Sequence, residues 1–592
     1  MKTLHSLAIA SASVLLLGAM TESASACGGT FCDTGPTAMP VDQSGENILF
    51  VMDGQNVEAH VQIQYQGVAE RFAWVVPMPK VPTVSVGSQL LFQRMLQGTA
   101  PTYSFNTQSL CGNGGSGGSA TGGFGGASGA AGAGGGPTVV FKETVGAFVV
   151  TVLQGGTAQE VSDWLSTNNY QSIPSATDIL KDYVNQNYVF VAIKMTAGAS
   201  VDEIHPLVFK YAGTEPCVPL KLTAVAATED MGVRTFFLGD DRVVPTNYKH
   251  ITLNPVRIDW NSFASNYMQS VSRGADSAVA NGRAFVTEYA GSSAVVPPST
   301  VYSSSWNSAA FTGLAPEKVI DELTNQNLAQ CFNENICVFN HPLLQPLLDE
   351  YLPVPASMSA AKFYSCLSCN VGLIDQSAWD ATKFAADFKS RIEDPGKNAQ
   401  GLLQKWPYLT RMFTTISPLE MTEDPMFHPR PGLPPVQAFQ VATRLTTCNG
   451  SSGMILPDSR QVALDGGQWP PWDSQMPWVE SIEEYMPGAG KIVLVDNSAK
   501  IDSLLAAWNQ SQGWPPPGAG GTAGAGAASG IGGSGNAGNG GNAGNGTGGS
   551  ALDQTEPAGG GCGCSVPGRG GSLPLGLSAL ALGLIGLRRR SS

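Results

Sequence analysis

The sequence predicts an α+β fold, with a β-rich N-terminal half and a mostly helical C-terminal insertion or lobe. Two observations predict it. Short runs that alternate apolar and polar residues recur as far as about residue 260, which is the pattern of strands with one buried face. From about 262 to 413 these runs give way to longer stretches, interrupted by prolines, whose pattern is mostly helical.

A β-hairpin is predicted from Ile48 to Tyr65, because Asp53-Gly54 is a turn dipeptide of two-residue hairpins. Residues 57–65 then alternate apolar and polar side chains, as a strand with one wet face does. A third strand is predicted from Phe72 to Val76, and the strand pattern resumes from Val139 to Leu153.

Two helices follow these strands. Thr157 and Glu160 have the spacing of a capping box, and Ser175 to Asn187 is the second helix. A last helix is predicted from Asn497 to Gln510. Further strands are predicted at Tyr188–Met195, Pro206–Tyr211, Pro219–Ala226, Arg234–Leu238, Ile251–Ile258, Val436–Thr447 and Ile492–Val495.

Two tracts do not have the composition of a folded core. More than half of residues 112–136 are glycine, and residues 512–561 are rich in Gly, Ala and Asn. Neither tract buries enough apolar surface to offset the entropy of ordering it. We therefore expect a disordered insert, a flexible stalk, and one exported ectodomain over residues 27–511.

Residues 1–26 have the three parts of a secretory signal peptide. Lys2 begins a short polar start, an apolar run extends from Leu7 to Met20, and Ala24-Ser25-Ala26 is a small-x-small cleavage site. Signal peptidase is then the expected processing partner, and it would leave Cys27 as the first residue. A lipidated Cys27 is the lesser alternative, because Ala24 stands where lipoprotein signals usually have Leu.

Residues 562–592 have the pattern of a sorting signal. Cys562-Gly563-Cys564 precedes an apolar run from Leu573 to Leu587 and a cluster of three arginines at 588–590. Fifteen helical residues reach only ~22 Å, short of the ~30 Å hydrocarbon core. The segment resembles the MYXO-CTERM signal, which implies cleavage by a membrane sorting protease and a lipid on Cys562 or Cys564. A short membrane helix that is retained is the alternative.

Charge and cysteine content narrow the class of partner. The formal net charge of −14 lacks the basic patch that nucleic-acid binding requires. In an oxidising compartment, cysteines outside the sorting signal favour a disulfide framework, and their odd number leaves one over. Sequence proximity suggests two local bridges, Cys331–Cys337 and Cys366–Cys369. The remaining ectodomain cysteines are Cys27, Cys32, Cys111, Cys217 and Cys448.

Motifs that could carry chemistry are weak. A redox Cys366-x-x-Cys369 needs a helix N-terminus after a strand, and its flank does not have that pattern. The spacing of Cys331 and Cys337 departs from paired zinc ligands, so we expect no metal. Trp469, Trp472 and Trp478 fit a proline-stiffened loop on the core better than a binding face. The histidines are isolated and are interpreted as structural: His60, His205, His250, His341 and His428.

The ectodomain resembles a family known as domain of unknown function 2330, as far as about residue 260, with a weaker likeness as far as about 500. This family has no assigned reaction, so the resemblance implies no catalytic residues. The segments that carry the likeness are Cys27-Gly28-Gly29-Thr30-Phe31-Cys32, Pro40-Val41-Asp42-Gln43, Glu46-Asn47-Ile48-Leu49-Phe50, Phe72-Ala73-Trp74-Val75-Val76-Pro77-Met78-Pro79, Phe190-Val191-Ala192-Ile193-Lys194 and His205-Pro206-Leu207.

We therefore expect a structural or adhesion-type binding protein displayed at the cell surface or outer membrane, with no cofactor and an unknown ligand. Two alternatives remain open. One is an exported hydrolase whose site is assembled from residues distant in the sequence. The other is a thiol–disulfide partner that uses Cys366 and Cys369.

Overall fold

The computed structural model describes residues 42–66, 72–109, 137–170, 174–214, 216–225, 227–332, 336–448 and 450–514. Helices and strands both contribute to the described fold, and the predicted α+β class is confirmed. Among the helices of these ranges, none has the length and apolar character needed to cross a membrane.

A ten-stranded mixed sheet forms the centre of the molecule. Its neighbours β1 and β10 are parallel, as are β12 and β13, and all its other neighbouring pairs are antiparallel. In spatial order the strands are β22 (Lys491–Asp496), β21 (Val479–Tyr485), β12 (Lys249–Leu253), β13 (Ala284–Ser292), β16 (Tyr408–Ile416), β10 (Met231–Gly239), β1 (Asp42–Asp53), β2 (Asn56–Gln66), β9 (Leu207–Ala212) and β4 (Thr83–Val86).

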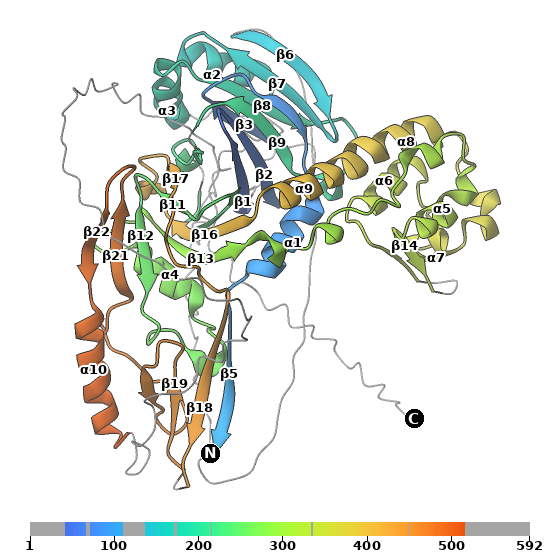
Figure 1. Cartoon of the computed structure of the whole chain (residues 1–592). Helices are drawn as coiled ribbons and strands as arrows, with labels where there is room; N and C mark the ends of the chain where they lie inside the picture. The colour runs from blue at the N-terminus through green and yellow to red at the C-terminus, as the bar shows by residue number, and fades with distance from the viewer. Residues whose placement is uncertain are drawn as a thin grey trace, which may run out of the picture.

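A four-stranded antiparallel sheet packs on one face of the central sheet, and Figure 1 shows it at the top. Trp74 and Phe148 from this sheet and Phe50 from the central sheet lie in the shared apolar core. Two helices cover its outer face. The elements are β3 (Ala73–Met78), β8 (Val189–Met195), β7 (Phe148–Gln154), β6 (Thr138–Val145), α2 (Ala158–Thr167) and α3 (Pro174–Asn185).

The other face of the central sheet packs against α1 and a helical lobe, which projects to one side in Figure 1. Leu49 and Phe236 of the sheet share this second core with Leu91 of α1. The elements are α1 (Gln89–Thr99), α5 (Val319–Asn325), β14 (Ala329–Cys331), β15 (Cys337–Phe339), α6 (Leu344–Tyr351), α7 (Ala360–Ser365), α8 (Ala381–Phe388), the π-helix Lys389–Glu393 and α9 (Asp394–Lys405).

A third sheet lies below the central one in Figure 1, where β5 and β18 run side by side although they are far apart in the sequence. The insert at 112–136 therefore follows a strand of this sheet and precedes β6 of another. The remaining elements are β20 (Gln461–Ala463), β19 (Ser452–Ile455), β18 (Phe439–Thr446), β5 (Thr102–Ser109), the pair β11 (Val243–Pro245) and β17 (Phe427–Pro429), α4 (Tyr267–Ala275) and α10 (Ser498–Ser511).

Most predicted elements are confirmed, including the hairpin β1–β2 and the capping box of α2. The strand predicted at Pro219–Ala226 is wrong, because the chain forms a 3-10 helix at Thr223–Val225. Leu220 and Leu222 alternate with polar residues and are buried, as in a strand. The backbone N–H of Lys221, however, donates to the Asp424 carboxylate and not to the carbonyl of a neighbouring strand.

The stretch expected to be mostly helical, 262–413, contains β13 and most of β16, both in the central sheet. Both strands are largely buried and carry buried polar residues such as Thr287, Glu288 and Arg411. They therefore show neither the alternation of a half-exposed strand nor the continuous apolar run of a buried one.

Candidate binding site

A cavity of about 470 Å³ lies where two parallel strands of the central sheet separate. β12 and β13 pair over only three registers, which end at Ile251 and Val286. Beyond that point β12 continues along β21 and β13 continues along β16. Thr287 lies at a register shift in β13, and such bulges re-aim side chains. The strands therefore open a gap that side chains line from both faces of the sheet.

The size of this cavity suits a small-molecule ligand, since such pockets hold roughly 300–1,000 Å³. Three other cavities in the described part of the chain measure about 10, 20 and 10 Å³, room for about one water each. The residues that line the large cavity include Tyr103, Arg242, His250, Ile251, Leu253, Tyr267, Val286, Thr287, Glu288, Leu433, Val436, Gln437, Gln440, Glu483, Tyr485 and Lys491.

Three polar side chains meet on one wall of the cavity. The Thr287 Oγ1 lies 2.9 Å from His250 Nε2, and Arg242 Nη2 donates to the same Oγ1 at 3.1 Å. Arg242 Nη2 also lies 3.4 Å from His250 Nε2. Because the guanidinium only donates, the Thr287 hydroxyl accepts from it and can give its own hydrogen to His250 Nε2.

Glu483 lies on the other side of the His250 ring. Its Oε2 is 3.8 Å from His250 Nδ1 and accepts from the Tyr485 hydroxyl at 2.7 Å. Its Oε1 accepts from Lys491 Nζ at 2.6 Å. Burial pushes the pKa of Glu483 up, but His250, Lys491 and Tyr485 outweigh it and bring the pKa to about 2. Burial lowers the pKa of His250, so a neutral imidazole faces an ionised carboxylate.

Arg242 has a side-chain N–H without a hydrogen-bond partner in the described part of the chain. Its side chain is 7 % exposed, Nη1 donates to the Pro434 carbonyl at 2.8 Å, and Nε has no hydrogen-bond partner. Among the described residues Arg242 forms no ion pair. A buried donor left without an acceptor costs about 1–3 kcal/mol, more when charged. Protein atoms cover Nε, so the unmatched positive charge of the guanidinium, and not this N–H, is what Arg242 presents to the cavity.

Another part of the lining is already paired. Glu288 accepts from the Tyr267 hydroxyl at 2.9 Å and forms a buried ion pair with Arg411. Burial and the Glu288 charge together raise the pKa of Tyr103 and of Tyr267. These residues bound the cavity, and the Tyr267 hydroxyl is fixed by Glu288. Arg242 is the residue with an unmatched charge.

The predicted site residues are not part of this cavity. Both local bridges suggested by proximity are formed, Cys331–Cys337 and Cys366–Cys369, so these four sulfurs are not available as zinc thiolates. Cys448 is disulfide-bonded and Cys217 is a buried cysteine. The other predicted processing and cysteine positions lie outside the described residues: Ala26, Cys27, Cys32, Cys111, Cys562 and Cys564.

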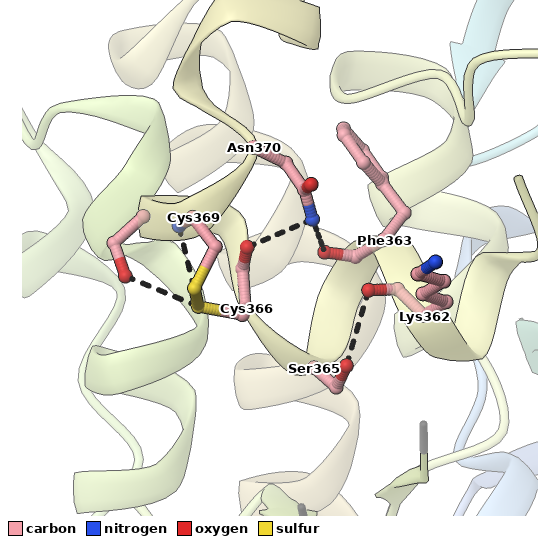
Figure 2. The surroundings of a disulfide bond; sticks show 7 residues. Lys362, Phe363, Ser365, Cys366, Cys369 and Asn370 are labelled. Atoms are coloured by element: carbon pink, nitrogen blue, oxygen red, sulfur yellow. Dashed lines mark hydrogen bonds between the residues drawn. A yellow bond between two sulfur atoms is a disulfide. The ribbon is translucent and has the colours of Figure 1, made fainter. Parts of the chain in front are cut away.

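Figure 2 shows that Cys366 follows the last residue of α7. The backbone N–H of Cys369 donates to Cys366 Sγ, and the Asn370 side chain donates to the Cys366 carbonyl at 2.9 Å. A thioredoxin-type thiolate instead opens an α-helix after a strand. The surroundings of this bridge are those of a closed turn that joins α7 to a short 3-10 helix.

Four of the five histidines named above do not line this cavity. His205 is typical: its Nε2 accepts from the Ala147 N–H at 3.0 Å and its Nδ1 lies 3.0 Å from the Pro206 carbonyl. His250 is different, because the fold brings it to Thr287 and Glu483, and no spacing in the sequence signals this. The tryptophan loop packs on the core, where Trp469 donates to the Val256 carbonyl and Arg257 stacks on Trp478.

Residues 21–335 match a family described as "Uncharacterized protein conserved in bacteria (DUF2330)". The chain belongs to this family. The match ends between the two extents of about 260 and 500 that the resemblance suggested, and it includes Arg242, His250 and Thr287 but not Glu483. Comparisons with the curated proteins and with the solved structures give no match.

Proposed function

We propose that this chain is an exported, surface-displayed binding protein, and that its ligand is a small molecule that carries a carboxylate. The observation that carries the binding proposal is the buried Arg242, which lines a cavity of about 470 Å³ and forms no ion pair with a described carboxylate. The apolar walls of the cavity, among them Ile251 and Val436, suit the uncharged part of such a ligand.

Charge favours an anion at this position. Glu483 is paired with Lys491, and Glu288 is paired with Arg411. Arg242 is therefore the cation in the described lining that has no carboxylate of its own. A guanidinium presents its donors in a planar fork that matches a carboxylate, and burial strengthens that attraction.

Calorimetric titration of the full chain with a panel of short-chain and aromatic carboxylic acids tests the ligand class. A member of the panel should bind, and Arg242→Gln should weaken binding about 10- to 100-fold, the equivalent of one charge-assisted contact. The matched control is Arg94→Gln, which removes an arginine of α1 that does not line the cavity. Equal affinities of the wild type and Arg242→Gln would refute the proposal.

Surface display is supported by the sequence patterns of residues 1–26 and 562–592 and by the disulfide-bonded cysteines, which suit an oxidising compartment. Mass spectrometry of the surface fraction of the native host tests it. We expect a mature chain that begins at Cys27 and ends near Cys562 or Cys564 with a lipid attached. Recovery of the unprocessed chain from the cytoplasm would overturn this part.

A further inference from the structure

We infer that Thr287, His250 and Glu483 form a hydroxyl–imidazole–carboxylate relay, and that this relay transfers the acyl group of a small ester to water. The inference rests on the proposed function only in placing the ester in the same cavity. It adds a chemical step that a binding protein does not need.

The geometry is that of a nucleophile, a base and a group that orients the base. Thr287 Oγ1 lies 2.9 Å from His250 Nε2, within the range of a nucleophile–base hydrogen bond. On the far side of the ring, Nδ1 lies 3.8 Å from Glu483 Oε2, which is beyond hydrogen-bond distance, and Nδ1 has no other partner among the described residues. The relay therefore requires this contact to shorten when substrate binds. All three residues line the cavity, and each comes from a different strand: β13, β12 and β21.

The relay requires the His250 tautomer that carries its proton on Nδ1. In that tautomer Thr287 Oγ1 accepts from Arg242 and donates its own hydrogen to the unprotonated Nε2. The ring proton is then on Nδ1, on the side of Glu483. Lys491 and Tyr485 donate to Glu483 and keep it ionised beside the imidazolium that forms during the reaction.

The reaction then proceeds in two balanced halves. Thr287 Oγ1 forms a bond to the ester carbonyl carbon while its proton passes to His250 Nε2, and the carbonyl electron pair moves onto oxygen. The C–O bond to the alcohol breaks, and the alcohol leaves with that proton. Water attacks the acyl-threonine by the same route through His250. The acid leaves, and the Thr287 hydroxyl is restored.

Arg242 has the donor that this chemistry needs. The intermediate carries a negative oxygen one bond from the attacked carbon, close to Thr287. Arg242 already contacts Thr287 Oγ1 through Nη2, so its guanidinium lies beside the position where this oxygen forms. A fixed donor at a developing oxyanion typically contributes about 10²–10³ in rate.

Covalent labelling tests the relay directly. The full chain is treated with an alkyl fluorophosphonate, which bonds to activated hydroxyl oxygens as the P–F bond breaks and fluoride leaves. Peptide mass spectrometry should place the adduct on Thr287. Thr287→Val should abolish the adduct and Thr287→Ser should keep it, while His250→Gln should slow labelling about 10²–10⁴-fold. The matched control is Thr235→Val, a buried threonine of β10 with no imidazole partner.

Two results would overturn the inference: no adduct on the folded wild type, or an adduct that persists in Thr287→Val. The rate of p-nitrophenyl butyrate hydrolysis should fall in the same variants in which the rate of labelling falls. The outcome is separable from that of the proposed function, because carboxylate binding is measured on its own. A chain that binds a carboxylate but is never labelled keeps the binding proposal and loses the relay.

Discussion

Glu46 on β1 gives a prediction that can be worked out from burial alone. Its side chain is 0 % exposed, and neither carboxylate oxygen has a hydrogen-bond partner. The residue lies opposite Ile63 of β2 and Val233 of β10, on the face that also presents Ile48 to the core between the two sheets. Because no partner compensates for the lost water, burial raises the pKa of Glu46 from 4.5 to about 8.

The sign of the stability effect follows from proton counting. Between pH 4.5 and about 8 the folded chain keeps the proton that the unfolded chain has released. The folded state therefore binds more protons, and the free energy of unfolding falls as the pH rises through this window. Each pH unit contributes about 1.4 kcal/mol, so the loss reaches roughly 3 kcal/mol by pH 7 and roughly 5 kcal/mol by pH 8.

Glu46→Gln removes this titration and leaves the shape of the side chain nearly unchanged. The wild type should lose stability relative to the variant by about 1.4 kcal/mol per pH unit across the window, and the difference should level off above pH 8. Urea unfolding of both chains from pH 5 to 9 measures it. Glu46→Leu should reproduce the same slope although its absolute stability differs. A difference between wild type and Glu46→Gln that stays constant with pH would refute the reasoning.

Two further predictions concern stability. Thr157→Ala should lower the free energy of unfolding by about 1 kcal/mol in urea titrations, because Thr157 Oγ1 accepts the Glu160 N–H in the capping box of α2, while Thr157→Ser should keep most of it. Glu288→Leu should cost about 3–5 kcal/mol by leaving the Arg411 charge buried and unpaired. The double variant Glu288→Leu, Arg411→Met should recover much of that loss, and a double variant no more stable than Glu288→Leu would contradict the pairing.

The parts of the fold that the sequence predicts correctly are those set by local interactions. The turn after Asp53 uses Gly54 at a φ of 66°, a conformation that glycine adopts at little cost. The capping box of α2 depends on two residues three positions apart. Both signals are complete within a few residues, so tertiary packing did not need to be known.

Elements set by tertiary packing were missed. β13 and β16 carry buried polar residues such as Glu288 and Arg411, so their sequences lack the continuous apolar run that identifies a buried strand, and the pattern places them in a helical stretch. In residues 219–226 a strand is predicted where there is none. Apolar and polar residues alternate there, but the backbone forms a 3-10 helix, and Asp424 accepts the backbone N–H that a strand would use.

The cavity could not be predicted for the same reason. His250 and Thr287 are 37 residues apart, and Glu483 reaches them only because β21 pairs with β12 at the edge of the sheet. Read singly, His250 has the sequence context of any buried structural histidine. The contacts of His250 with Thr287 and Glu483 depend on which strands pair with β12. The hydrophobic pattern of one strand does not show which strand pairs with it.

The site follows from how the central sheet accommodates its second parallel pair. β12 pairs with the antiparallel strand β21 on one side, and β13 pairs with the antiparallel strand β16 on the other. After three residue pairs β12 and β13 separate. A gap in a buried sheet is normally filled by apolar side chains, because interiors are close-packed. Here polar groups line it, and Glu288 and Glu483 have ion-pair partners while Arg242 does not. Burying a charge that has no partner lowers stability, so packing does not explain why Arg242 is there. The proposed ligand carboxylate would explain it, because it would pair with that charge.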